Sequence, residues 1–256
     1  MVTFSCHTTL SMAPGCSELK RCEWKILPLR KNSTVPAPEA CVPMLMNGNT
    51  TWNAESALTK LFHRLYPVSR ACIEEIARKL EPVRFERGDI VVYQDEPCDV
   101  IYFFHTAMLR IGFVKEGRED TVAFGGDGDV FFSVPTFFCN EPSTFSLMAL
   151  DLSLGWQMSF ATYRAMERRF PELTIWMRNL LGVQLYAVQN MYRNAYMTTA
   201  MQRFKNFCSR YDINPGAIKS QPLSRINRII PLKYIAQYLG ITQQTLSKLR
   251  RHRFTD

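Results

Sequence analysis

Short apolar runs separated by turn residues fill the middle of the chain, from about Leu80 to Gln157. Each run has the length of a β-strand, and Gly, Pro and Asp recur between the runs at intervals of roughly 8–12 residues. The runs are Ile90–Tyr93, Val100–Phe104, Met108–Val114, Thr121–Phe124, Val130–Val134 and Phe145–Leu150. Turns at such intervals are typical of a small barrel or jelly roll, so this segment predicts a β-roll domain.

Helical patterns lie on both sides of this segment. Before it, residues 54–80 place Leu58, Leu61, Phe62 and Leu65 on one helical face. After it, a long helix is expected to begin after Pro171 and to end near Tyr196.

Apolar residues in the long helix repeat at alternating spacings of four and three, as in a heptad seam. They are Leu181, Leu185, Val188, Tyr192 and Ala195. Such a seam can pack against the same seam of a second chain, which predicts a homodimer. The seam covers only about two and a half heptads, so a helix packed on its own domain explains the spacing nearly as well.

The segment from Ile230 to Arg251 has the pattern of two short helices joined by a tight turn. Pro231 suits a first helical turn, Gly240 suits the left-handed residue that ends a helix, and Thr242 suits the N-cap of the next one. Ile235, Ala236 and Leu239 give the first helix an apolar face. The pattern predicts a helix-turn-helix, although an ordinary helical hairpin has similar spacing.

The second of these helices would lie in the major groove of DNA, with Leu246 and Leu249 facing inward. The expected base contacts are Gln243, Gln244, Ser247 and Lys248. Gln pairs with adenine and Lys donates to guanine, so these side chains have the chemistry of direct readout. The expected phosphate contacts from the end of the helix are Arg250, Arg251 and Arg253.

Positive charge is concentrated in the same part of the chain. Residues 201–256 contain eleven Lys or Arg and two acidic residues, a net charge of +9, whereas the whole chain carries +8. Charge confined in this way indicates a nucleic-acid-binding segment, because Lys and Arg release counterions from the phosphate backbone.

The order of these elements resembles the Crp/Fnr family of bacterial transcription regulators over roughly residues 56–251. The roll contributes Phe85–Asp89, Val100–Phe104 and a Gly128-Asp129 turn to this resemblance. Its most specific part is the pattern Ile-Ala-x-x-Leu-Gly-Ile-Thr-x-x-Thr-Leu-Ser-x-x-Arg, which is similar to family members from the Bacteroidetes.

The resemblance implies a set of roles and partners. Gln243, Gln244 and Lys248 fall where the family contacts bases, and Thr242 and Thr245 fall where it contacts phosphate. The implied partners are double-stranded DNA with a palindromic site and a second copy of the chain. RNA polymerase and an unidentified small-molecule effector are further candidates.

The segment that holds cyclic nucleotide in the family departs from the family pattern. Family members that bind cyclic nucleotide have a Gly-Glu pair and, about ten residues on, an Arg followed by Ser or Thr. Here these places hold Phe132-Ser133 and Ser143-Thr144. A buried phosphate without a cationic partner is costly, which argues against cyclic AMP as the effector. The residues that would line a remodelled effector pocket are Arg110, Phe132, Ser133, Ser143 and Thr144.

The expected fold class is α+β, with an N-terminal double-stranded β-helix or jelly-roll sensor domain over residues 54–164. A long dimerisation helix at 165–200 and a helix-turn-helix domain at 201–256, without an evident wing, would follow. Residues 1–53 lack sustained periodicity and contain five Pro residues, which favours a disordered or mis-annotated extension, with translation starting at Met44 or Met46.

No catalytic residue, metal or cofactor is expected. The roll contains His105 alone and no His-x-His pair, whereas a metal-dependent enzyme of this shape needs two or three His and a carboxylate. Iron–sulfur members of the family need closely spaced Cys, and Cys6, Cys16, Cys22 and Cys41 are widely spaced. No apolar run is long enough to cross a membrane, so a cytoplasmic location is expected.

These patterns together predict a sequence-specific, dimeric transcription regulator with a degenerate nucleotide pocket. The alternative is a β-roll module that binds a ligand or a protein and whose basic C-terminal segment binds nucleic acid without sequence preference.

Overall fold

The computed structural model describes residues 54–210 and 229–251 of the 256-residue chain. The expected N-terminal extension, residues 1–53, and the phosphate-contact candidate Arg253 therefore lie outside the described residues. The side chain of Arg251 lies outside them as well.

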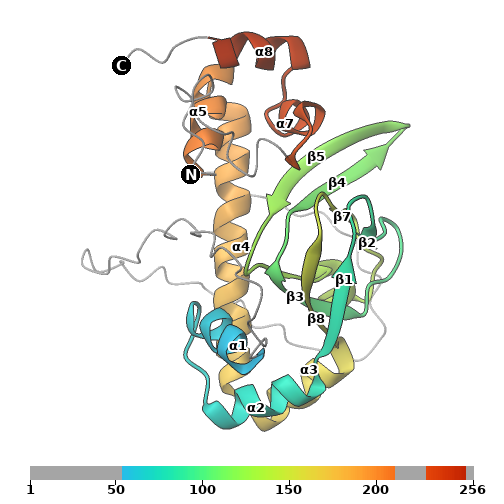
Figure 1. Ribbon diagram of the computed structural model, residues 1–256, viewed down its shortest axis with the longest axis vertical. Coiled ribbons are helices and arrows are strands. Elements are labelled where there is room, and N and C mark those ends of the chain that lie inside the picture. The colour runs from blue at the N-terminus through green and yellow to red at the C-terminus, as the bar shows by residue number, and fades with distance from the viewer. Residues whose placement is uncertain (1–53, 211–228, 252–256) are drawn as a thin grey trace, which may run out of the picture. The chain divides into compact units, whose positions relative to one another are not determined.

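Eight strands in the described part of the chain form two antiparallel four-stranded sheets (Figure 1). One has the order β1-β8-β3-β6 and the other β2-β7-β4-β5. The strands are β1 (Glu81–Phe85), β2 (Ile90–Val92), β3 (Val100–Thr106), β4 (Leu109–Lys115), β5 (Arg118–Gly125), β6 (Val130–Phe131), β7 (Ser146–Ala149) and β8 (Ser153–Ser159). Interleaving of early and late strands in both sheets confirms the predicted jelly-roll-like domain.

Two of these strands had no counterpart in the sequence prediction. β1 and β8 pair with each other from Glu81↔Gln157 to Phe85↔Ser153. Both contain a residue that weakens a strand pattern, Pro82 in β1 and Gly155 in β8. Pairing with β3 places β8 inside the sheet, and this long-range contact outweighs the local signal.

The strand predicted at Val130–Val134 is wrong beyond Phe131. β6 ends there, and residues Pro135–Cys139 form a single π-helical turn, η1, that ends at Asn140 in the left-handed conformation. Pro135 has no N–H with which to continue a ladder, and Phe132 turns into the core instead.

The helical stretch predicted at residues 54–80 is two helices, α1 (Ala54–His63) and α2 (Arg70–Lys79). The helix breaks at Pro67, because a proline disfavours helical geometry at the residue before it. Ser69 then caps α2 by accepting a hydrogen bond from the backbone N–H of Cys72. The predicted long helix is confirmed as α4 (Glu172–Met197), and α3 (Phe160–Arg169) precedes it.

Aromatic side chains join the helices to the first sheet. Phe62 of α1, Phe103 of β3 and Trp176 of α4 are fully buried, with ring centroids 4.6 Å apart for Phe62 and Trp176 and 5.8 Å apart for Phe62 and Phe103. A second cluster around Tyr102 and Phe104 belongs to the roll strands themselves. The N-terminal part of α4 is therefore fixed to the roll by burial of apolar surface.

Gly155 is the position where the roll tolerates no side chain. A Cβ at Gly155 would overlap the carbonyl oxygen of Phe103 and lie 2.9 Å from the Cα of Phe104. Both obstacles are backbone of the neighbouring strand, so they cannot rotate away.

We expect Gly155→Ala to destabilise the protein by about 1–3 kcal/mol, because β3 and β8 would have to separate. Gly126→Ala is the matched control, since nothing lies within 4 Å of a Cβ added there. Urea unfolding followed by circular dichroism would measure both variants. Equal stability of the two would show that the close approach of β3 and β8 is not tight in solution.

Candidate nucleic-acid interface

The predicted helix-turn-helix is formed by α7 (Leu232–Tyr238) and α8 (Gln243–Arg251), which we call the reader helices. Gly240 between them has φ +62°, the left-handed conformation expected for it. The hydroxyl of Thr242 accepts a hydrogen bond of 3.1 Å from the backbone N–H of Thr245, so Thr242 caps α8 as predicted.

The predicted apolar face of the reader helices is buried. Ile235, Ala236, Leu239 and Leu246 are at most 2% exposed. They pack against residues of α5 (Ala200–Arg210) that include Phe204 and Phe207. Burial of this face fixes the opposite face of α8 toward solvent.

Arg203 of α5 holds the turn between the reader helices. Its guanidinium donates one hydrogen bond of 2.7 Å to the carbonyl oxygen of Leu239 and another of 2.7 Å to that of Thr198. From the sequence, Arg203 contributes only to the positive charge of this segment, because a hydrogen bond to a carbonyl 36 residues away leaves no local signal.

The candidate base contacts lie on the outer face of α8. Gln243, Gln244 and Lys248 are exposed, whereas Ser247 is half-buried. Among the phosphate candidates, Thr242 is exposed, and Thr245 and Arg250 are half-buried. The Thr242 and Thr245 hydroxyls lie 2.9 Å apart. The structure brings these residues together on one helix, and their roles toward DNA stay predictions.

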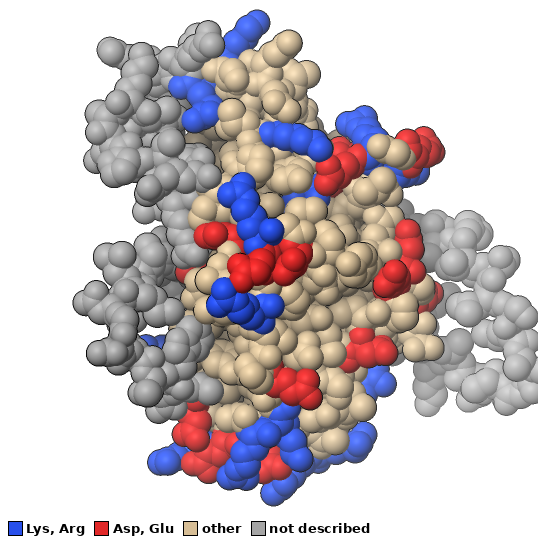
Figure 2. Space-filling model, turned by 45° about the vertical axis from the view of Figure 1, so that its right-hand side comes forward, with Lys and Arg blue, Asp and Glu red and all other residues tan. Residues whose placement is uncertain are grey.

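The electrostatic setting of the reader helices is positive. Residues 200–210 and 229–251 contain Lys and Arg but no Asp or Glu. In Figure 2 the upper end, which carries α7 and α8 in Figure 1, displays Lys and Arg side chains, and acidic side chains appear below and beside it. This distribution favours an anionic partner.

The reader helices also pack against the roll. Phe124 of β5, Phe207 of α5 and Tyr238 of α7 form an aromatic group, with Tyr238 5.6 Å from each of the other two ring centroids. Met108 and Leu150 belong to the same buried cluster. The apolar core of the reader helices is therefore shared with the roll.

Arg110, a candidate for the effector pocket, lies at this contact. Its side chain is 2% exposed. Its guanidinium forms an ion pair of 2.7 Å with Glu119 and donates a hydrogen bond of 2.8 Å to the hydroxyl of Thr121. The guanidinium carbon is 4.3 Å from the ring centroid of Tyr234. The charge of Arg110 is thus balanced on β5 and covered by α7.

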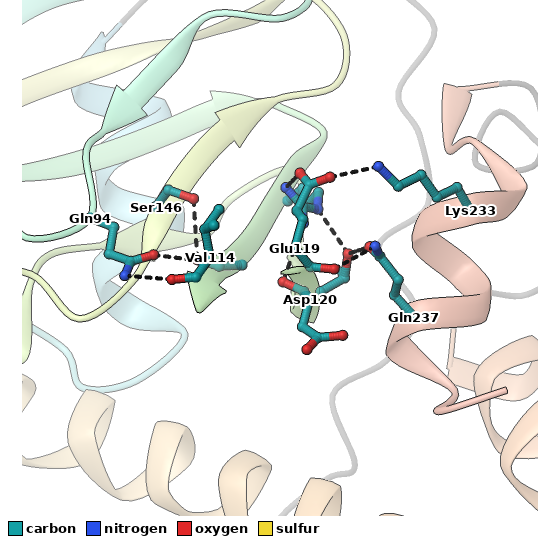
Figure 3. Close-up of polar contacts among 10 residues, drawn as sticks. Gln94, Val114, Glu119, Asp120, Ser146, Lys233 and Gln237 are labelled. Atoms are coloured by element: carbon teal, nitrogen blue, oxygen red, sulfur yellow. Dashed lines mark hydrogen bonds and ion pairs between the residues drawn. The ribbon is translucent and has the colours of Figure 1, made fainter. Parts of the chain in front are cut away.

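Polar contacts from α7 complete this group (Figure 3). Lys233 donates to Glu119 at 2.7 Å, and the Gln237 amide donates to the Glu119 carbonyl at 2.7 Å and accepts from the Thr121 hydroxyl at 2.7 Å. The hydrogen bond from Lys233, with the nearby Arg110 charge, holds the pKa of Glu119 below its usual range. We call these six residues the β5–α7 junction: Arg110, Glu119, Thr121, Lys233, Tyr234 and Gln237.

The other pocket candidates have different neighbours. Phe132 is buried against Phe137, with ring centroids 5.4 Å apart. Ser133 is buried and accepts a hydrogen bond from the Thr136 hydroxyl. Ser143 is buried, and its hydroxyl donates a hydrogen bond to the carbonyl oxygen of Phe145. Thr144 is exposed. The contacts of these residues do not bring them together with Arg110.

The predicted seam on α4 is mostly uncovered. Leu185, Val188, Tyr192 and Ala195 are exposed, whereas Leu181 is half-buried against the core of the roll. Large apolar side chains at such exposure are unusual on a helix that meets only water.

The described residues contain no group of three or more His, Cys, Asp or Glu arranged to hold a metal ion. None of their helices combines the length and the apolar content needed to cross a membrane.

Comparison with known proteins gives the same fold. Residues 82–169 match the model of the cyclic nucleotide-binding domain. The CRP-like cAMP-activated global transcriptional regulator of Mycobacterium tuberculosis is 24% identical over 182 residues, which is 71% of this chain and 80% of that protein.

Two solved structures share the architecture. FixK2 from Bradyrhizobium japonicum matches with a TM-score of 0.55 at 17% identity, over 66% of this chain and 82% of FixK2. The c-di-GMP responsive global regulator CLP from Xanthomonas campestris matches with a TM-score of 0.53 at 12% identity, over 71% of this chain and 89% of CLP. The roll, the sequence similarity and the shared architecture agree: residues 82–169 match the cyclic nucleotide-binding domain, and the chain is similar to a CRP-like transcriptional regulator.

Proposed function

We propose that the protein is a sequence-specific DNA-binding transcription regulator that acts as a dimer on a palindromic site. The observation that carries this proposal is the outer face of α8, where Gln243, Gln244 and Lys248 are exposed side by side on a capped helix. The Mycobacterium tuberculosis relative is named a global transcriptional regulator, and CLP is named a global regulator that links cell–cell signalling to virulence gene expression.

The chemistry of this face suits the major groove. Gln offers a donor and an acceptor that match adenine, and Lys donates to the acceptors of guanine. Leu246 is fully buried beneath this face and fixes the rotation of α8. Half-buried Arg250 at the end of the helix suits a phosphate contact, which positions the helix without reading sequence.

The exposed seam on α4 supports a dimer. Two copies joined along Leu185, Val188 and Tyr192 would bury apolar side chains that one copy leaves in water. Two-fold symmetry would present two α8 helices to successive major grooves, and this arrangement fits an inverted repeat.

Cyclic AMP is not the effector in this proposal, although the name of the Mycobacterium tuberculosis relative describes that protein as cAMP-activated. Ser143 stands where the family places the phosphate-binding Arg, and its backbone pairs with residues 95 and 96, which are Asp and Glu. Arg110 is engaged with Glu119. Neither Ser143 nor the engaged Arg110 therefore offers a free cation to a cyclic phosphate.

We expect Gln244→Ala to weaken binding to the preferred duplex by about 1–3 kcal/mol and to leave binding to random duplex unchanged, because only base contacts carry sequence information. Arg250→Ala is the comparison variant and should weaken both complexes similarly. Fluorescence anisotropy titrations with both duplexes would measure this. Equal losses for Gln244→Ala on both would favour nucleic-acid binding without sequence preference.

Val188→Asp should dissociate the dimer. It places two like charges at a symmetric apolar contact, and the dimer dissociation constant should rise by roughly two orders of magnitude or more. Val183→Asp is the matched control, because Val183 lies on the same helix off the seam and is 54% exposed, against 58% for Val188. Sedimentation equilibrium of the two variants would decide. A dimer that survived Val188→Asp would place the subunit contact elsewhere.

Cyclic AMP at about 1 mM should leave the melting temperature of the protein unchanged. A site with a Kd of about 10 µM would instead stabilise the fold by about 2.7 kcal/mol. Differential scanning calorimetry with 5′-AMP as the control ligand would measure the shift. A rise that depends on cyclic AMP concentration and is absent with 5′-AMP would contradict the degenerate pocket.

A further inference from the structure

The β5–α7 junction engages a lysine of the helix-turn-helix with a carboxylate of the roll. Lys233 is the second residue of α7, and its ammonium lies 2.7 Å from Glu119. Figure 3 shows Lys233 and Gln237 extending from α7 toward Glu119 on β5. The two partners are 114 residues apart, so the contact joins the sensor fold to the reader helices.

Glu119 is held in place by the buried guanidinium beneath it. One carboxylate oxygen of Glu119 is 2.7 Å from Arg110, and the other is 2.7 Å from Lys233. Arg110 is fixed in turn by its bonds to the Thr121 hydroxyl and to the Asp120 carbonyl, and by the ring of Tyr234. An exposed ion pair is weak when both side chains lose freedom on forming it. Here Arg110 already orients the carboxylate, so the entropy lost on forming the pair falls mainly on Lys233.

Lys233 lies on the part of the helix-turn-helix that is expected to contact DNA phosphates. In a helix-turn-helix, the first helix crosses the phosphate backbone while the second enters the groove. A lysine near the start of α7 is therefore suited to a phosphate, and Glu119 competes for the same ammonium group. The outer face of α8 stays exposed in this arrangement, so the contact would weaken binding without blocking base recognition.

We propose that Glu119 is an autoinhibitory residue that withholds Lys233 from the DNA backbone. This inference rests on the proposed DNA-binding function and adds a specific device to it. Movement of the β4–β5 hairpin away from α7 would free Lys233 and raise the affinity for DNA. The position of the hairpin in the sensor fold would then set the strength of DNA binding.

The test is a gain of affinity, which loss of a merely structural contact would not produce. Glu119→Gln removes the charge and keeps the shape. We expect it to bind duplex DNA about two- to fivefold more tightly than the wild type, the range expected for one released surface ion pair. The slope of log K against log salt should steepen by about one, because one more phosphate is neutralised.

Asp120→Asn is the matched control. It makes the same change of net charge one residue away on β5, at a side chain that pairs with Arg118 rather than with Lys233. We expect Asp120→Asn to raise the affinity for DNA by less than Glu119→Gln does, and to leave the slope of log K against log salt unchanged. A gain of equal size in Asp120→Asn would reduce the effect to net charge and overturn the proposal.

Lys233→Gln completes a double-mutant cycle. In the Glu119→Gln background it should abolish the gain and restore the wild-type salt slope. Glu119→Asp guards against misfolding of Glu119→Gln, since it leaves a carboxylate beside Arg110 but one methylene short of Lys233. This variant should also bind more tightly than the wild type. Circular dichroism would confirm that each variant is folded.

The outcomes separate the two claims. If the full-length wild type binds duplex DNA and neither Glu119 variant binds more tightly, the autoinhibitory role is wrong and the proposed function stands. If the wild type and all variants bind no duplex at about 0.05 M salt, where charge contacts are strongest, both claims are wrong.

Discussion

The buried charge of Arg110 is the constraint on which the arrangement of roll and reader helices depends. A guanidinium removed from water is costly unless it is paired and hydrogen-bonded. Glu119, Thr121 and the Asp120 carbonyl satisfy it. Gly112 on the same strand leaves the necessary room, because a Cβ there would lie 2.8 Å from the guanidinium. The β4–β5 hairpin must therefore keep its register, which places Glu119 against α7.

An apolar contact beside this ion pair joins the same elements. Phe124 of the roll packs in one aromatic group with Phe207 and Tyr238, and the small helices α5, α7 and α8 complete their core with roll residues. Helices this short gain most of their stability from tertiary packing. The orientation of α8 is thus linked to the roll, and a change in the hairpin would reach the proposed DNA-binding surface through packed side chains.

The local patterns predicted much of this molecule. Periodicity located the long helix, and Gly240 and Thr242 marked the ends of the reader helices, because caps depend on neighbouring residues. β1 and β8 were missed, since Pro82 and Gly155 hide strands that pairing stabilises. The role of Arg110 was also out of reach. The contact of its guanidinium with the Tyr234 ring joins residues more than one hundred positions apart, and so do the contacts of Lys233 and Gln237 with β5.

Selection of bound fragments from a random double-stranded DNA pool tests the central claim most directly. The purified protein would be used at about 0.15 M salt, where screening suppresses binding by charge alone. Dimeric readout by α8 predicts recovery of an inverted repeat with half-sites about one helical turn apart, roughly 34–36 Å. Recovery of fragments with no common motif would contradict sequence-specific recognition, and recovery of a single half-site would contradict the dimer.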